Sequence, residues 1–326
     1  MNIYDPSKHY CFLVYALVSC ANRESVVEAQ ASHFTYILDS SRTITVAGTE
    51  LGCQVAFSAD GSKIIVSAEE ANNGDGQFYA YYDDGTTWTL YDDPGVAGIE
   101  GSDENFGKYV DVSADGNTVA TGTRLHDGGT LKNNGYANIW FYNGMTWSQL
   151  GSNIEGDGDG ANLGDYVKIS DDGTRFVTGG EGHKGTKGTA QVFSFNNVTR
   201  DWDQLGSDIT GERSGDGFGK SSAMSGDGST IAISTNDERK YIWVLCYDEV
   251  TGDWVRKGTQ FDFPSASYRT KSLWLNHDGS QFAYGAYDTD SNDGFVRVFN
   301  WDGSTWVQMG ADVISDDVSM RKFGEG

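Results

Sequence analysis

The chain has 326 residues and a formal net charge of −24, from 47 acidic and 23 basic residues. So acidic a surface repels phosphate backbones, which excludes nucleic acid as an expected partner. The 43 glycines, 13% aromatic residues and only 3 prolines favour tight turns and half-buried strands. We therefore expect an all-β protein, a monomer, with a protein or carbohydrate ligand.

The first residues are typical of a targeting segment. A basic residue precedes an apolar run over residues 11–18, and small residues follow it. This pattern predicts a secretory signal peptide over residues 1–21, cleaved after Ala21. Alternatively, Cys20 is the lipidated residue of a bacterial lipoprotein. No other stretch approaches the ~20 apolar residues of a membrane span. We predict a linker at 22–33 and a secreted or cell-surface protein.

A repeat of about 55 residues organises the remaining chain, residues 34–326. One landmark is an Asp-Gly pair that recurs every 51 to 57 residues, at Asp60-Gly61, Asp115-Gly116, Asp172-Gly173, Asp227-Gly228 and Asp278-Gly279. A second is a tryptophan near the end of each copy, at Trp88, Trp147, Trp202, Trp254 and Trp306. Two landmarks that stay in register indicate five complete repeats, at about 51–105, 106–162, 163–217, 218–268 and 269–322.

Each copy is predicted to form four strands. In the first copy these are residues 54–58, 63–68 and 77–82 and a strand through Trp88, with the Asp-Gly pair as a hairpin turn in which Gly61 adopts positive φ. The second strand is apolar on both faces, which indicates burial on both faces. Small residues at one position of that strand suggest closely stacked sheets: Ser67, Gly122, Gly179, Ser234 and Gly285. Stacked four-stranded sheets at this period predict a β-propeller.

The sequence on either side of the five complete copies leaves the number of blades open. Phe323-Gly324 begins a sixth copy, and residues 34–46 alternate in a way that could supply a closing strand. A five-bladed ring and a fragment of a larger ring are both compatible with this pattern.

A dipeptide opens the copies, eight residues before the turn aspartate: Leu51-Gly52, Phe106-Gly107, Leu163-Gly164 and Phe218-Gly219, with Arg269-Thr270 as a departure. Together with the hairpin and the period, it resembles the FG-GAP repeats of integrin α-subunit propellers. It is closer still to the FG-GAP-like repeats of secreted algal and bacterial proteins. The resemblance covers about residues 46–326 and implies an adhesion role. The Asp-x-Asp-x-Asp-Gly calcium loops of integrin repeats are missing from these hairpins.

The loops between the second and third strands vary most, and loops on a rigid scaffold often carry function. They span residues 69–76, 124–135, 181–188, 236–240 and 287–294. We expect ligand contacts from Asn72, Asn73, His126, Asp127, Asn133, His183 and Lys184. The two histidines occupy matching places, and we interpret them as solvated loop residues rather than metal ligands.

One of these loops offers alternate oxygen ligands of the kind Ca²⁺ prefers, at Asp288, Asp290, Asn292 and Asp293. Calcium is the single cofactor predicted, and the alternative is a solvated polar loop. The sequon Asn197-Val198-Thr199 lies in a predicted turn, where Asn197 would be glycosylated in a eukaryotic host.

The sequence holds no nucleophile elbow, zinc-protease motif or phosphate-binding loop. Close carboxylate pairs are expected by chance among 47 acidic residues, so they do not by themselves predict a glycosidase. No catalytic or cofactor-binding residue is predicted. We interpret the chain as a protein- or glycan-binding module rather than an enzyme. The alternatives are a carbohydrate-active enzyme and a purely structural extracellular repeat.

Overall fold

The computed structural model describes residues 51–69, 71, 74–91, 95–97, 105–182, 187–235, 241–263, 267–288 and 294–314. The predicted signal peptide, linker, closing strand and sixth copy lie outside these residues. The described residues contain strands and no helix. No helix there is long and apolar enough to cross a membrane.

The described strands form five antiparallel sheets, numbered here in chain order. Sheet 1 holds β1 (Leu51–Phe57), β2 (Lys63–Ala68), β3 (Gln77–Asp83), β4 (Trp88–Leu90) and β5 (Val96–Ala97). Sheet 2 holds β6 (Tyr109–Val112), β7 (Thr118–Thr123), β8 (Tyr136–Tyr142), β9 (Trp147–Gln149) and β10 (Ile154–Glu155). Sheet 3 holds β11 (Tyr166–Ile169), β12 (Arg175–Gly180), β13 (Thr189–Asn196), β14 (Asp201–Gln204) and β15 (Ile209–Thr210). Sheet 4 holds β16 (Ser221–Met224), β17 (Thr230–Ser234), β18 (Tyr241–Asp248), β19 (Asp253–Arg256) and β20 (Phe261–Asp262). Sheet 5 holds β21 (Tyr268–Leu275), β22 (Gln281–Asp288), β23 (Gly294–Trp301), β24 (Trp306–Gln308) and β25 (Val313–Ile314).

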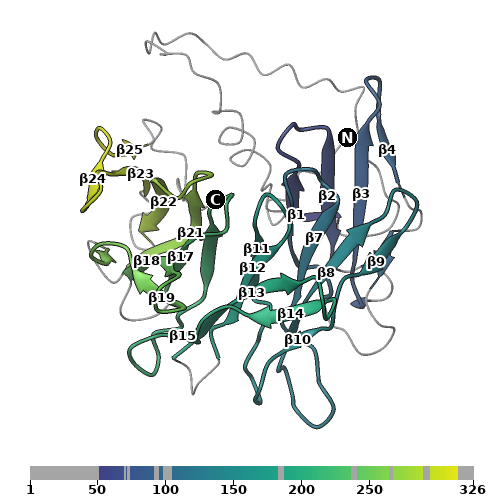
Figure 1. The fold of residues 1–326 in the computed structure, drawn as a ribbon, viewed down its shortest axis with the longest axis horizontal. Helices are drawn as coiled ribbons and strands as arrows, with labels where there is room; N and C mark the ends of the chain where they lie inside the picture. Colours follow the sequence, from purple (N-terminus) through teal and green to yellow (C-terminus); the bar gives the residue numbers. More distant parts are fainter. Residues whose placement is uncertain are drawn as a thin grey trace, which may run out of the picture.

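Every sheet repeats one plan. Four strands pair in chain order, and a short fifth strand pairs with the far end of the third, so the outer strand is broken in two. The first strands contact one another in succession, β1 with β6, β6 with β11, β11 with β16 and β16 with β21. Figure 1 shows the sheets following one another in chain order from purple to yellow. Antiparallel four-stranded sheets stacked side by side through their first strands make a β-propeller.

Apolar clusters at the seams hold neighbouring sheets together. One cluster joins Val177 and Ile209 of sheet 3 to Ile231 and Trp243 of sheet 4, and comparable clusters join the other neighbours. The repeated tryptophan also crosses the seam, because its indole N–H donates to a backbone carbonyl of the preceding sheet. These bonds are Trp202 to Leu150, Trp254 to Leu205 and Trp306 to Lys257, at 2.7–2.8 Å.

The break in the outer strand makes room for that tryptophan. Gly206 interrupts the strand with φ of 80°, and a Cβ there would lie 2.9 Å from Trp254 Cδ1. Both the left-handed backbone and the close approach require glycine. The broken strand, which the pattern did not predict, is thus part of the seam.

The two ends of the sheets differ. At one end, called the turn end, the first strand runs into the second through the Ser-x-Asp-Gly turn, and Gly61 adopts φ of 73° as predicted. The turns of successive sheets are linked, since Ala59 N donates to Ala114 O and Ala114 N donates to Asp171 O. At the opposite end, called the loop end, each first strand begins and each second strand ends.

The strand bounds predicted for sheet 1 agree closely with those observed. Strand β2 has the predicted bounds, β1 begins three residues earlier, and β3 ends one residue later. The predicted close stacking is confirmed at Gly122, where a Cβ would lie 2.2 Å from Gly164 O of the next sheet.

The outward face of sheet 5 is more exposed than its counterparts. Met309 and Val313 are 49% and 54% exposed. By strand pairing, Val313 corresponds to Ile209, which is buried against sheet 4.

Candidate functional site: a charge cluster at the loop end

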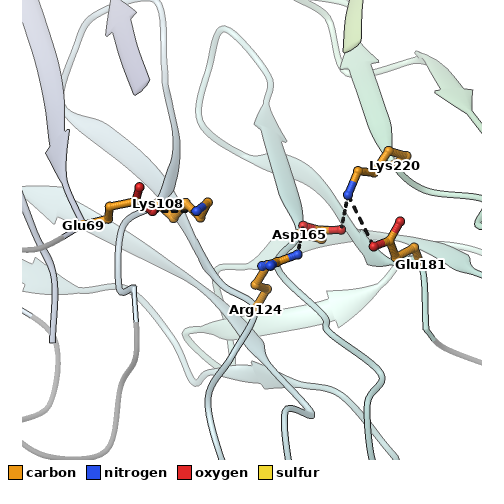
Figure 2. Close-up of polar contacts among 6 residues, drawn as sticks. All are labelled: Glu69, Lys108, Arg124, Asp165, Glu181 and Lys220. Carbon is orange, nitrogen blue, oxygen red and sulfur yellow. Dashed lines mark hydrogen bonds and ion pairs between the residues drawn. The ribbon is translucent and has the colours of Figure 1, made fainter. Parts of the chain in front are cut away.

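Six charged residues from three successive seams gather at the loop end, and we call them the charge cluster. Three follow second strands and three precede first strands: Glu69, Arg124, Glu181, Lys108, Asp165 and Lys220. Figure 2 shows them as two groups, Glu69 with Lys108 and, apart from that pair, Asp165 and Glu181 with Arg124 and Lys220. Glu69, Arg124 and Glu181 are the first residues of the variable loops of sheets 1, 2 and 3.

The pairing follows a rule. The residue after the second strand of one sheet meets the residue before the first strand of the next. Glu69 Oε2 lies 2.6 Å from Lys108 Nζ, Arg124 Nη1 lies 3.5 Å from Asp165 Oδ1, and Glu181 Oε1 lies 3.3 Å from Lys220 Nζ. The sign of the charge is reversed in the middle pair, yet each pair is complementary. The stacking of the sheets thus determines where a pair forms, but not which of the two sheets provides the cation.

Asp165 is the centre of the cluster. Its side chain is fully buried, and its second carboxylate oxygen lies 3.4 Å from Lys220 Nζ. Burial raises the pKa of Asp165, because desolvation of the carboxylate outweighs the attraction of Lys220 and Arg124. Burial, followed by the negative charge of Asp165, raises the pKa of the neighbouring Tyr109 hydroxyl. A carboxyl group in this setting can hold a proton more readily than an exposed one.

Polar atoms near the cluster have no protein partner. In the described part of the chain, six buried side-chain nitrogen or oxygen atoms make no hydrogen bond: Thr123 Oγ1, Arg124 Nε, Tyr166 Oη, Thr189 Oγ1, Ser222 Oγ and Ser234 Oγ. All six belong to the loop-end halves of sheets 2 to 4. Buried polar groups are normally paired, so these six atoms are free to take hydrogen-bond partners from outside the chain.

The structure places three of the predicted contact residues at this end. His126, Asp127 and Asn133 lie in the loop that follows Arg124, and Asp127 and Asn133 are exposed. The Asp127 carboxylate accepts a hydrogen bond from Asn133 N, and His126 meets the Tyr136 ring edge-on at 4.9 Å. The other four predicted residues, Asn72, Asn73, His183 and Lys184, lie outside the described residues.

This loop is tied to the loop that enters sheet 3. Lys132 N donates to Asp159 Oδ1, Gly160 N donates to Lys132 O, and Leu163 N donates to Asn134 O. Two loops far apart in sequence thus form one surface beside Arg124 and Asp165.

Of the predicted calcium ligands, only Asp288 is described, at the end of β22 opposite Tyr268. Asp290, Asn292 and Asp293 lie outside the described residues. Across the described ranges, no three His, Cys, Asp or Glu side chains gather as a metal site would need. Asn197 is exposed in the turn between β13 and β14, as its predicted glycosylation requires.

Glu69, Arg124 and Glu181 begin three of the loops that were expected to contact a ligand, but their pairing across the seams was not predicted, although the repeat carries its signal. Counted from the turn aspartate, Glu69, Arg124 and Glu181 stand nine residues later in their copies. Lys108, Asp165 and Lys220 stand seven residues before it. Aligning the copies would have revealed two columns of alternating charge. Pairing between copies, however, follows from the stacking of the sheets and not from the copies themselves.

No protein-family model matches this sequence, and no curated protein matches it. Solved structures are similar in fold. Hydrazine synthase from Kuenenia stuttgartiensis is 13% identical, with 88% of this chain and 72% of that chain covered and a TM-score of 0.54. A protein from Lactobacillus plantarum is 17% identical, with 82% and 72% covered and a TM-score of 0.54. A Bacteroides fragilis protein described as a 6-phosphogluconolactonase is 12% identical, with 80% and 84% covered and a TM-score of 0.52. At these identities the likeness shows the fold alone.

Proposed function

We propose that this chain is a β-propeller binding module that takes a protein or glycan ligand at its loop end. The observation that carries the proposal is the charge cluster, where Lys108, Arg124 and Lys220 remain 23–30% exposed beneath variable loops. The chain has a net charge of −24, but at the loop end these three cations offset the negative charge of the neighbouring carboxylates. The unpaired buried polar atoms are concentrated at the loop end too, and they support the same location for the binding site.

A glycan array and a panel of extracellular-matrix proteins would identify a ligand for the intact chain. The affinity for that ligand is then measured with two charge reversals. Lys132→Glu changes an exposed side chain at the loop end, and Arg200→Glu changes an exposed side chain at the turn end. We expect Lys132→Glu to weaken binding at least tenfold and Arg200→Glu to leave it unchanged. Equal effects of the two variants would contradict the proposal.

A second candidate, a carbohydrate-active enzyme, is favoured by one observation. Asp165, whose pKa is raised by burial, and Glu181 approach the same Lys220 ammonium. Glycosidases use a pair of carboxyl groups with separated pKa values. Hydrolysis of chromogenic glycosides that is lost in Asp165→Asn and kept in Asp171→Asn would replace the binding proposal by this one.

We propose that the module belongs with FG-GAP-like propellers and acts in a secreted or cell-surface setting. The repeated opening dipeptide and the acidic composition support this assignment. We also propose that the five sheets are the five complete repeats and that a sixth copy begins after them. The exposed Met309 and Val313 support a further sheet at that face.

Calcium is part of the same proposal, through the loop that begins at Asp288. The melting temperature of the intact chain in Ca²⁺ and in chelator tests it. We expect Ca²⁺ to raise the melting temperature by several degrees, since a ligand that binds only the folded state stabilises that state. Identical melting curves would remove calcium from the proposal.

A further inference from the structure

A hollow of about 200 Å³ lies at the turn end of the seam between sheets 1 and 2. Lys63, Tyr82 and Tyr91 of sheet 1 and Tyr142 of sheet 2 line it. It opens at the opposite end from the charge cluster. We propose that this tyrosine hollow binds one neutral pyranose ring of a glycan.

The three rings form a fixed frame. The Tyr91 and Tyr142 ring centroids are 4.8 Å apart at 74°, and those of Tyr82 and Tyr91 are 5.9 Å apart at 62°. Tyr91 is buried and its hydroxyl donates to Gly116 O at 3.1 Å, which anchors the floor. Tyr82 is 40% exposed and forms part of the rim. Ring faces and edges at large angles to one another can hold the C–H faces of a sugar on more than one side.

Polar groups at the hollow remain open to a ligand. Neither the Tyr82 hydroxyl nor the Tyr142 hydroxyl has a hydrogen-bond partner among the described residues. Lys63 Nζ donates to Asp115 O at 2.8 Å and to Asn117 Oδ1 at 2.6 Å, which leaves one of its three N–H donors. Two phenol hydroxyls and one ammonium donor around apolar rings match the alternation of hydroxyls and C–H groups on a pyranose.

The size of the hollow limits the ligand. Sites for drug-sized molecules and cofactors span about 300–1,000 Å³, so this hollow admits one ring and not a nucleotide. Lys63, the cation among the residues that line it, is already held by two acceptors in a strongly acidic protein. An uncharged ring is therefore favoured over an anionic one.

The seam itself does not need Tyr82 or Tyr91. By strand pairing, the place of Tyr82 is taken by Phe141, Ser194 and Cys246 in the next three sheets. The place of Tyr91 is taken by Leu150, Leu205 and Lys257, whose carbonyls still accept the seam tryptophan bonds. Three phenols thus occur together at one seam, whereas the other seams are closed by other side chains.

The test is a titration of the intact chain with the methyl pyranosides of glucose, galactose and mannose. Binding is measured by tyrosine fluorescence and by calorimetry. We expect at least one to bind with a Kd near 1 mM, as suits a single ring. Tyr82→Ala should weaken binding at least tenfold, and Tyr82→Phe, which removes only the hydroxyl, should weaken it two- to fivefold.

Phe141→Ala is the matched control, because Phe141 is the counterpart of Tyr82 and is equally exposed at 39%. It should leave the affinity unchanged. Thermal melting of each variant confirms that it folds. No binding of any pyranoside by the folded wild-type chain would overturn the proposal, as would equal losses in Tyr82→Ala and Phe141→Ala. Tighter binding of methyl glucuronide than of methyl glucoside would overturn the choice of a neutral ring. Lys132→Glu at the loop end should have no effect, so this proposal and the proposed function fail separately.

Discussion

The turn end and the loop end of this propeller follow different rules. At the turn end one arrangement recurs, since Ser58, Ser113, Ser170 and Ser225 each donate from Oγ to the turn aspartate at 2.6–2.7 Å. At the loop end, matching positions hold lysine in two sheets and aspartate in a third, and only their pairing with the neighbouring sheet is kept. Repetition marks the end whose turns are linked from sheet to sheet, and variation marks the end at which we propose that a ligand binds.

The largest expected difference between the ends comes from removing one carboxylate at each. Asp165→Ala at the loop end leaves Arg124 and Lys220 without their shared partner. Breaking a fully buried pair costs about 3–5 kcal/mol, and the partial exposure of the two cations reduces this to about 2–3 kcal/mol. Asp172→Ala at the turn end removes an exposed turn carboxylate and should cost about 1 kcal/mol. Urea unfolding of both variants measures the difference, and a smaller loss for Asp165→Ala would contradict this ranking.

A charge exchange tests whether pairing matters more than sign. In Glu69→Lys/Lys108→Glu the pair is reversed, as it already is between Arg124 and Asp165. Each single substitution places like charges together at a half-buried site and should destabilise the fold. The double variant should recover about 1 kcal/mol relative to the sum of the two, the coupling expected of a close pair. If the losses of stability in this double-mutant cycle are additive, then other neighbouring residues, and not the pairing itself, determine which position carries the cation.

The same contrast explains what could be predicted from the sequence. The turn end repeats, so the Asp-Gly pairs and the tryptophans were enough to give the strand order and the bounds of β2. The partners across the seams could not be derived in this way. Trp254 donates a hydrogen bond to Leu205, and Asp165 pairs with Arg124, because separate sheets stack against each other. In both cases the two partners lie in different copies of the repeat, so the pattern within one copy does not predict the contact. The loop of residues 124–135 was predicted as a contact surface, while Lys108, Asp165 and Lys220 were overlooked because the charge at their position changes sign from copy to copy.

Acid should weaken the turn end. Hydrogen bonds from Ser62 N and then from Ser58 Oγ lower the pKa of Asp60 to about 2, and Ser280 lowers the pKa of Asp278. A lowered pKa in the folded state gives stability that is present above the unfolded value of 3.8 and is lost as the pH falls through about 2. The free energy of unfolding, measured in urea from pH 5 to pH 2, should decrease. Asp60→Asn keeps the turn acceptor without its charge and should make this decrease less steep; an unchanged slope would assign the acid sensitivity elsewhere.

The smallest expected effect concerns the one turn that departs from the repeat. His277 stands in the fifth turn, and its Nδ1 lies 2.6 Å from Asp171 Oδ2 of the third turn, across Gly226. The bond to Asp171 raises the pKa of His277 above its usual value. A raised pKa gives stability that is fully present below the unfolded value of 6.5 and is lost as the pH rises through the folded one. Because both side chains are about half exposed, the melting temperature should fall by only a degree or two between pH 6 and pH 8. His277→Gln should remove that fall, and NMR titration of the His277 ring in the wild-type chain should show the raised pKa. If His277→Gln melts with the same dependence on pH as the wild type, the contact between the third and fifth turns does not contribute to the stability of the ring.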